Sequence, residues 1–240
     1  MLSKVIQLHR STHSLQMSAI TKFSSFAVGD INVGKTIRNK MGSISIPLTK
    51  MNNAKIYIQT PVMFSPFGIS ELSTESYTKY SLDLSFKNYE EKEDIATMHT
   101  LIESIDTFMV EIGVHNSVEW FGKAMSKEVI EELYRPLMRH AKDPSKYAPT
   151  FKMKFRNGYG KNASEIQAKA FDIDKNEMDV RDIQKGSSMK VIFEISPIWF
   201  VNKQFGISLN ISQVMVTDLP ASRSLAYNAF FEDSMDDNCE

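Results

Sequence analysis

The chain has 240 residues, enough for one large domain with a buried core, and its 42% hydrophobic and 24% charged residues are typical of a globular protein. Its longest apolar runs, such as VIFEI and IWFV, are far shorter than the roughly 20 residues of a membrane-spanning helix, so we expect a soluble chain without a membrane partner. The single cysteine, Cys239, excludes an intramolecular disulfide and a cysteine-based metal site. The five histidines show no ligand spacing, so we expect neither a metal nor a cofactor.

Charge and composition separate both ends of the chain from its body. Residues 1–29 contain no acid, and we expect residues 1–16 to be a flexible leader before an ordered region that begins at Met17. Residues 230–240 carry five acidic side chains and no base. Because the whole chain has 29 acidic and 28 basic side chains, the net charge of −1 hides a basic body and an acidic tail. We expect a single domain over residues 17–229 and a disordered tail over residues 230–240.

Residues 29–36 read GDINVGKT and match the pattern G-x-x-x-x-G-K-[ST] of a phosphate-binding loop. Such a loop needs a buried strand before Gly29 and a helix that starts at Lys35. The preceding segment, ITKFSSFAV, has no continuous apolar run, and Gly42 and Pro47 leave too little room for a helix. The sequence therefore favours a glycine-punctuated turn that leads into a basic segment, and a nucleotide-hydrolysing enzyme is the weakest alternative.

The segments that follow change from the period of a strand to the period of a helix. Residues 54–60 (AKIYIQT) and 80–86 (YSLDLSF) alternate apolar and polar side chains and therefore predict strands. Over residues 90–113 apolar side chains recur at every third or fourth position, which predicts an amphipathic helix. Asn88 is its expected N-cap and Gly113 its expected stop.

A second helix is expected over residues 126–134, and the next strand is FKMKFR, residues 151–156. Its apolar side chains occupy one face, so Lys152, Lys154 and Arg156 line the other face at intervals of about 7 Å. That interval is close to the repeat of an extended nucleic-acid backbone. An ordinary amphipathic strand with a solvated basic face explains the same pattern.

Further strands are expected in IQAKAF, SMKVIFEI, PIWFV and FGISLNISQVMV. A helical insertion at about residues 90–140 thus lies between two groups of strands, which fits a single barrel or a highly curved sheet. The acidic segment FDIDKNEMDVRD, residues 171–182, lacks the glycine and the final Glu of a calcium loop, so it indicates a solvated turn. The chain has no catalytic arrangement of Ser, Cys and His, so we expect no enzymatic activity.

Taken in chain order, the segments KYAPTFKMKFR, KAFD and VRDIQKGSSMKVIFEISPIWFVNKQFGISLNISQVMV, followed by an acidic tail, resemble a known family. They are similar to the OB-fold single-stranded DNA-binding proteins of the T-odd phage type, as found in large nucleocytoplasmic DNA viruses. The resemblance covers roughly residues 30 to 240. It implies a mainly β, OB-fold-like five-stranded barrel with a helical insertion. It also implies binding of single-stranded DNA without sequence specificity, in DNA replication, recombination or repair.

The resemblance also implies partners and a location. In the family the acidic tail contacts replication proteins, such as a polymerase or a helicase/primase, and competes with DNA for the basic groove. We expect an intracellular protein; if it is viral, it acts at replication sites in the host cytoplasm or nucleus. Phage members end in an aromatic residue, whereas here two phenylalanines precede the acids. The partner-binding tail residues are Phe230, Phe231, Glu232, Asp233, Asp236 and Asp237.

The expected DNA-binding residues are cations that hold phosphates and aromatic rings that stack on bases. They are Lys35, Arg38, Lys40, Tyr57, Lys152, Lys154, Arg156, Tyr159, Lys161 and Trp199. The alternative function is that of a β-rich structural or virion interaction protein without enzymatic activity, whose basic face and tail contact other proteins. The sequence leaves the oligomeric state open, and a homodimer is one of the assemblies that fit.

Overall fold

The computed structural model describes residues 20–39, 42–74, 77–158 and 165–220. The expected leader, the acidic tail and three expected DNA-binding residues lie outside these ranges. Those three are Lys40, Tyr159 and Lys161.

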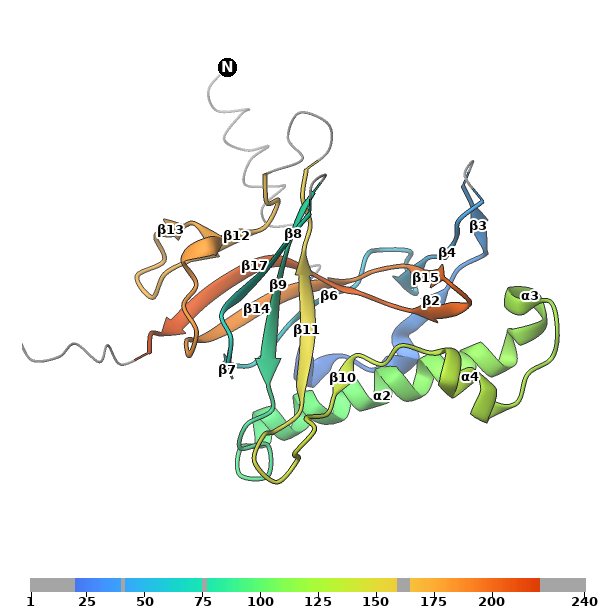
Figure 1. The fold of residues 1–240 in the computed structure, drawn as a ribbon, viewed down its shortest axis with the longest axis horizontal. Coiled ribbons are helices and arrows are strands. Elements are labelled where there is room, and N and C mark those ends of the chain that lie inside the picture. The colour runs from blue at the N-terminus through green and yellow to red at the C-terminus, as the bar shows by residue number, and fades with distance from the viewer. Residues whose placement is uncertain (1–19, 40–41, 75–76, 159–164, 221–240) are drawn as a thin grey trace, which may run out of the picture.

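A closed ring of five strands forms the centre of the described structure (Figure 1). Strand β14 pairs with β7, β7 with β9, β9 with β11, β11 with β17, and β17 pairs back with β14. Only the β11–β17 pair of this ring is parallel. The chain is thus mainly β and has the expected OB-fold-like five-stranded barrel. The ring strands are β7 (Met63–Phe64), β9 (Thr78–Ser85), β11 (Thr150–Phe155), β14 (Ser188–Ile195) and β17 (Leu209–Asp218).

Six strands extend the barrel sheet, and two smaller sheets lie beside it. The extending strands are β1 (Ile20–Lys22), β6 (Tyr57–Gln59), β8 (Ile69–Ser73), β10 (Met138–Arg139), β12 (Lys169–Phe171) and β13 (Glu177–Met178). A four-stranded sheet contains β3 (Ile37–Arg38), β4 (Ile44–Ile46), β15 (Ile198–Val201) and β16 (Gln204–Gly206). A two-stranded sheet contains β2 (Ile31–Val33) and β5 (Leu48–Lys50).

Alternation of apolar and polar side chains explains why these segments form barrel strands. On β11, Phe151, Met153 and Phe155 are buried, whereas the side chains between them are half-buried or exposed. On β14 the same alternation buries Met189, Val191 and other apolar residues against the β11 side chains in one core. The predicted core face of FKMKFR is therefore confirmed, and its three cations lie on the outside of the barrel.

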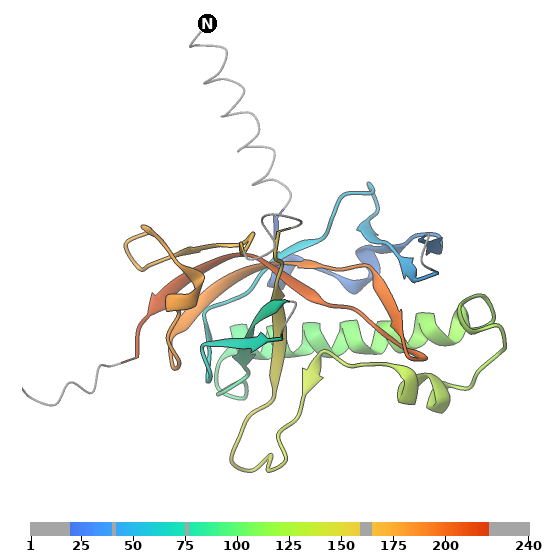
Figure 2. The same cartoon turned by 45° about the horizontal axis from the view of Figure 1, so that its top comes forward.

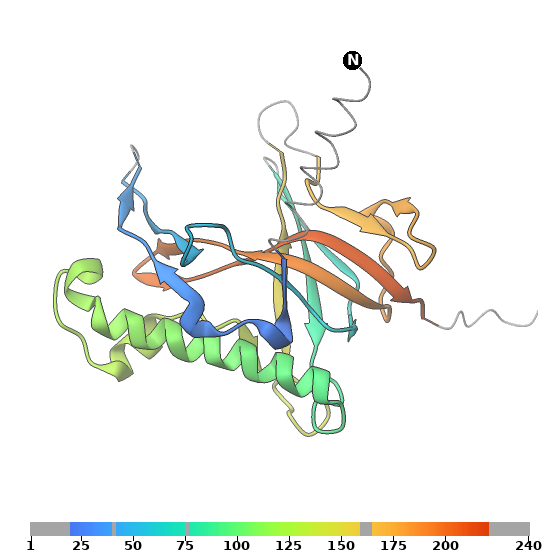
Figure 3. The same ribbon diagram turned by 180° about the vertical axis from the view of Figure 1, so that it is seen from behind.

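Three α-helices lie between β9 and β11, where the helical insertion was expected. They are α2 (Glu93–His115), α3 (Ser117–Phe121) and α4 (Lys127–Leu133). Helix α2 crosses below the strands, and Figure 2 shows it on that side from a second angle. The N-terminal turns η1 (Phe23–Ser25) and η2 (Val28–Asp30) run along α2 (Figure 3). The predicted helix over 126–134 is α4, with Ser126 at its N-cap.

Both predicted ends of the long helix, an N-cap at Asn88 and a stop at Gly113, were wrong. Asn88 is not its N-cap: it has a positive φ of 63° in the turn before the helix, and Lys92 occupies the N-cap position. Gly113 does not stop the helix but lies inside it. A Cβ atom there would lie 2.8 Å from Ile130 Cγ2 and 2.9 Å from Phe205 Cζ, so the glycine permits close packing of α2 on its neighbours.

A half-buried carboxylate ties α2 to the strand that follows the insertion. Asp106 on α2 accepts hydrogen bonds from the Tyr134 hydroxyl at 2.7 Å and from the backbone N–H groups of Leu137 and Met138 at 2.9 and 3.0 Å. Burial raises the pKa of Asp106, and burial next to Asp106 raises the pKa of Tyr134. These bonds fix the start of β10 against the helix, and β10 in turn pairs with β11.

The GDINVGKT segment does not form a phosphate-binding loop. Its first residues form η2 and β2, and the next element after Lys35 is the short strand β3 rather than a helix. The Thr36 hydroxyl donates to a carboxylate oxygen of Glu119 at 2.6 Å. The segment therefore lacks the helix at Lys35 that a phosphate-binding loop needs. In the part of the chain that the structure describes, no helix is long and apolar enough to cross a membrane.

We predict that Gly68→Ala destabilises the fold much more than Gly122→Ala. Both glycines have positive φ values, 65° and 80°, so an alanine at either position costs about 1–2 kcal/mol of backbone strain. A Cβ atom at Gly68 would also lie 2.6 Å from the backbone nitrogen of Lys185, whereas one at Gly122 meets no atom within 4 Å. Chemical denaturation should show an additional loss of roughly 1–3 kcal/mol in unfolding free energy for Gly68→Ala. Equal losses would contradict this packing of Gly68.

Candidate nucleic-acid interface

A row of polar side chains crosses five strands on the outside of the barrel sheet. Ser81 on β9 pairs with Lys154 on β11, which pairs with Asn210 on β17. Asn210 pairs with Glu194 on β14, and Glu194 pairs with Tyr57 on β6. Because directly paired residues in a sheet point to the same face, these five side chains lie on one surface. Two expected DNA-binding residues, Lys154 and Tyr57, therefore share a face although they are far apart in the sequence.

Glu194 is a buried carboxylate in this row, with 5% of its surface exposed. The Arg156 guanidinium donates to it at 2.8 Å, and the Lys55 ammonium group lies at 3.3 Å. The Tyr57 hydroxyl donates to the same carboxylate at 3.3 Å. Burial alone would raise the pKa of Glu194, but the hydrogen bond and positive charge of Arg156, aided by Lys55, hold its pKa below the usual range. Burial and the charge of Glu194 raise the pKa of Tyr57.

A second buried carboxylate, Asp83, lies on the same face of β9 and is also 5% exposed. The Lys152 ammonium group lies 3.5 Å from one of its oxygens, and the Arg139 guanidinium lies 3.7 Å from the other. Arg139 belongs to β10, which pairs with the start of β11. The two carboxylates thus hold four cationic side chains in place along the outside of the sheet.

Lys154 lies between these two groups and has no such partner in the part of the chain that the structure describes. Its ammonium group donates to the Ser208 hydroxyl at 3.0 Å, and no carboxylate of the described residues lies within 4 Å of it. Desolvation lowers the pKa of Lys154, and the positive charges of Lys79, Arg139 and Lys152 lower it further. The centre of the face is therefore a site of unbalanced positive charge.

We call this surface the basic face and define it by its cations, Lys55, Lys79, Arg139, Lys152, Lys154 and Arg156. Among the described residues, the carboxylates that pair with any of these six cations are Asp83 and Glu194. Two tyrosines adjoin them. Tyr57 is half-buried, and Tyr77 is 47% exposed with the Lys79 ammonium group 4.3 Å from the centre of its ring.

Sequence reasoning found three of these cations and missed the others. Lys79 carried a usable signal, because it continues the alternating face of Ser81 and Asp83 on β9. Lys55 carried a similar signal, since it lies two positions before Tyr57. The sequence around Arg139 gave no such signal, because only the pairing of β10 with β11 after the helical insertion brings Arg139 to this face.

The other described candidates, Lys35, Arg38 and Trp199, lie outside the basic face. Lys35 and Arg38 are exposed, and Trp199 is half-buried in β15. The strand register puts Trp199 on the same side of the four-stranded sheet as Ile37, and therefore on the opposite side from Arg38. The indole Nε1 of Trp199 is buried and has no hydrogen-bond partner among the described residues. Figures 1 and 3 show the β3–β4 hairpin rising on the same side of the barrel as the upper end of β8.

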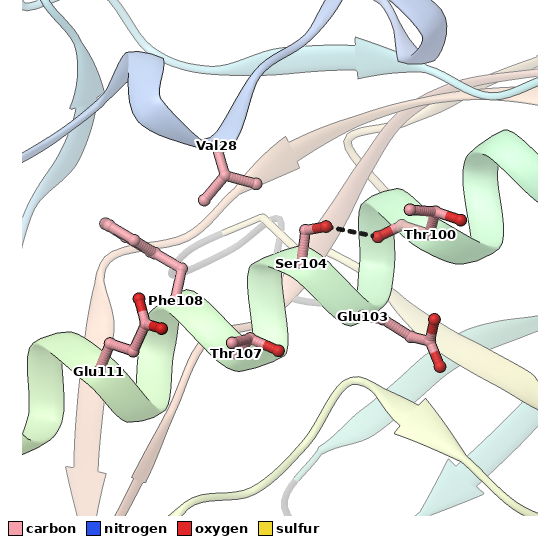
Figure 4. Close-up of a pocket in the computed structure, with 7 residues that line it drawn as sticks. All are labelled: Val28, Thr100, Glu103, Ser104, Thr107, Phe108 and Glu111. Atoms are coloured by element: carbon pink, nitrogen blue, oxygen red, sulfur yellow. Dashed lines mark hydrogen bonds between the residues drawn. The ribbon is translucent and has the colours of Figure 1, made fainter.

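Two other features of the described surface do not fit a phosphate ligand or a metal. The acidic segment around Asp172 forms a turn, in which the Asn176 backbone N–H donates to Asp172 at 2.8 Å, and no metal-binding cluster occurs among the described residues. A pocket of about 290 Å³ lies between η2 and the outer side of α2 (Figure 4). It is lined by hydroxyls, apolar groups and the carboxylates of Glu103 and Glu111, so it would repel a phosphate.

Comparison with solved structures returns single-stranded DNA-binding proteins of bacteriophages. The gp2.5 protein encoded by bacteriophage T7 is 16% identical with a TM-score of 0.47, and the match covers 72% of this chain and 98% of that chain. The protein of bacteriophage Enc34 in complex with single-stranded DNA is 10% identical with a TM-score of 0.43, covering 79% of this chain and 96% of that chain. At these TM-scores, the fold assignment rests on the pairing of this chain's own strands.

Comparison of the sequence with family models and with curated proteins gives a matching family but no matching curated protein. No curated protein matches the chain. A family model described as a family of unknown function, DUF5871, matches residues 87–233, which span the helical insertion, the later strands and the start of the acidic tail. Because this match covers more than half of the chain, the protein belongs to the family of unknown function DUF5871.

Proposed function

We propose that the chain binds single-stranded DNA without sequence preference along the basic face. The observation that carries this proposal is the position of Lys154, which has three cationic neighbours and no carboxylate among the described residues. Desolvation and then the charges of these three cations lower the pKa of Lys154, and a phosphate placed beside it would offset the repulsion among the cations. Single-stranded DNA is also the ligand by which the phage proteins above are described.

The aromatic rings favour a single strand over a duplex. In a duplex the bases are stacked on each other, whereas a single strand offers them to tyrosine rings such as Tyr57 and Tyr77. Lys152 and Lys154 are two positions apart on one strand and therefore about 7 Å apart, close to the repeat of an extended backbone. Cations at this repeat and rings on which any base can stack give affinity without reading sequence.

The buried carboxylates fit a binding surface because they position the cations without neutralising the face. Glu194 holds Arg156 and Lys55, and Asp83 holds Lys152 and Arg139, so long flexible side chains are partly ordered before a ligand arrives. Ordering them in advance lowers the entropy lost on binding. The proposed activity is binding alone and involves no catalytic step.

We propose that the protein acts in DNA replication, recombination or repair and that its acidic tail, residues 230–240, recruits replication proteins. The tail has five acids and no base, so it is also a competitor of DNA for the basic face. Recruitment would use the tail aromatics and acids named above, on a domain that we take to span residues 17–229.

Deleting residues 230–240 should tighten binding to an oligonucleotide of thymidines. The expected gain is largest at low salt, because screening weakens the competition between tail and DNA. Fluorescence anisotropy of a labelled oligonucleotide at two salt concentrations measures the gain. Equal affinity of the full and shortened chains at low salt would contradict tail competition and leave DNA binding itself untouched.

Replacing Lys154 should weaken DNA binding and reduce its dependence on salt. If Lys154 contacts one phosphate, Lys154→Ala makes the slope of log K against log salt shallower by about 0.7. The matched control is Lys123→Ala, which removes an exposed lysine of the helical insertion. Its slope should equal that of the unchanged chain. An unchanged slope for Lys154→Ala would place the DNA elsewhere.

Replacing Glu194 should lower stability in a manner that depends on pH. Glu194→Gln leaves the Arg156 guanidinium without its buried carboxylate, at a cost of about 1–3 kcal/mol at neutral pH. Since the pKa of Glu194 is lowered in the folded chain, its contribution is present above the ordinary pKa of about 4.3 and is lost as the pH falls through the folded value. The unfolding free energies of the unchanged chain and of Glu194→Gln, measured by urea denaturation, should therefore converge at acidic pH. The control Glu177→Gln, which removes an exposed ion pair with Lys169, should change little at any pH.

A further inference from the structure

A second row of side chains crosses the outer surface next to the row that contains Glu194. Ile192 on β14 pairs with Gln59 on β6 and with Gln213 on β17. Ile192 is two residues from Glu194, and Gln59 is two residues from Tyr57, so the second row lies about 7 Å from the first. Both rows face the same side of the sheet, and a ligand on the basic face can therefore extend onto the second row.

The second row borders an apolar hollow of about 260 Å³. Its apolar side chains come from three neighbouring strands, because Phe171 on β12 pairs with Met215 on β17 and Ile192 lies on β14. All three are half-buried, so they contribute an apolar surface that the barrel core does not cover. The hollow is smaller than the roughly 300–1,000 Å³ of pockets that hold drug-sized ligands, so it suits a single flat ring.

The polar groups around the hollow lack partners among the described residues. The side-chain amides of Gln59 and Gln213 make no hydrogen bond there, and no carboxylate lies within 4 Å of the Lys190 ammonium group. Each amide offers a donor and an acceptor to a ligand. Lys190 lies two positions from Ile192 on β14, so one cation flanks the hollow on the same face.

We propose that this hollow binds one nucleobase of a single strand whose phosphates continue along the basic face. This inference rests on the proposed function and adds a base-binding subsite to it. Phe171, Ile192 and Met215 would contact the faces of the ring, and the amides of Gln59 and Gln213 would bond its polar edge. A base combines a flat apolar face with donors and acceptors on its edge, which is the combination that the hollow offers.

Photo-crosslinking of the full chain to an oligonucleotide of 5-iodouracil tests the location of this subsite. We expect cross-linked peptides that contain Phe171 or Met215, in addition to peptides from the tyrosines of the basic face. Cross-links at Tyr57 or Tyr77 without any at residues 169–171 or 213–215 would overturn the subsite and leave the proposed function standing. Absence of any binding would overturn both.

Paired variants test the role of the amides. The double variant Gln59→Ala with Gln213→Ala should bind an oligonucleotide of thymidines roughly fivefold more weakly, and should bind an abasic oligomer of equal length as the unchanged chain does. Lys154→Ala is the matched control, because it should weaken binding to the thymidine oligomer and to the abasic oligomer by the same factor. Circular dichroism and thermal unfolding show whether the double variant is folded. Base binding in the hollow would be overturned if the folded double variant kept its full affinity for the thymidine oligomer. It would also be overturned if the affinity for both oligomers fell by the same factor.

Discussion

The register of β11 between β9 and β17 is the constraint on which the rest of the structure depends. The parallel pairing of β11 with β17 closes the five-stranded ring, and it also places Lys154 beside Asn210. Because side chains alternate along a strand, a slip of one residue would bury Lys154 and expose Met153. The same pairings therefore build the core and assemble the polar row, so fold and candidate interface are specified together.

The electrostatics of the basic face combine two opposing requirements. A surface that attracts a polyanion needs excess positive charge, and that excess repels itself within the folded chain. Two buried carboxylates hold four of the cations, whereas Lys154 between them lacks such compensation among the described residues. The uncompensated position is thus surrounded by neighbours whose geometry is fixed, which is a favourable arrangement for taking up a phosphate.

Local periodicity predicted much of this structure, and long-range pairing decided the remainder. The two faces of FKMKFR and the long amphipathic helix follow from patterns within single segments. The order of the segments left a single barrel and a highly curved sheet open, and the family resemblance supplied the five-stranded barrel that the structure has. The C-terminal end of α2 could not be predicted from a local pattern. Gly113 permits close packing against Phe205, and no pattern within the segment reveals that contact. Arg139 reaches the basic face only through tertiary pairing, and the half-buried state of Trp199 depends on packing beside Gly206. The roles assigned to the tail residues stay predictions.

The central claim is that this chain binds single-stranded DNA through the basic face, and one titration tests it most directly. The chain without residues 230–240 is added at low salt to a labelled oligonucleotide of thymidines and, separately, to a duplex of equal length. We predict tighter binding to the single strand, with an affinity that falls steeply as salt is raised. No binding to the single strand, or equal binding to single strand and duplex, would contradict the claim. Equal binding would favour a structural protein with a generally basic surface.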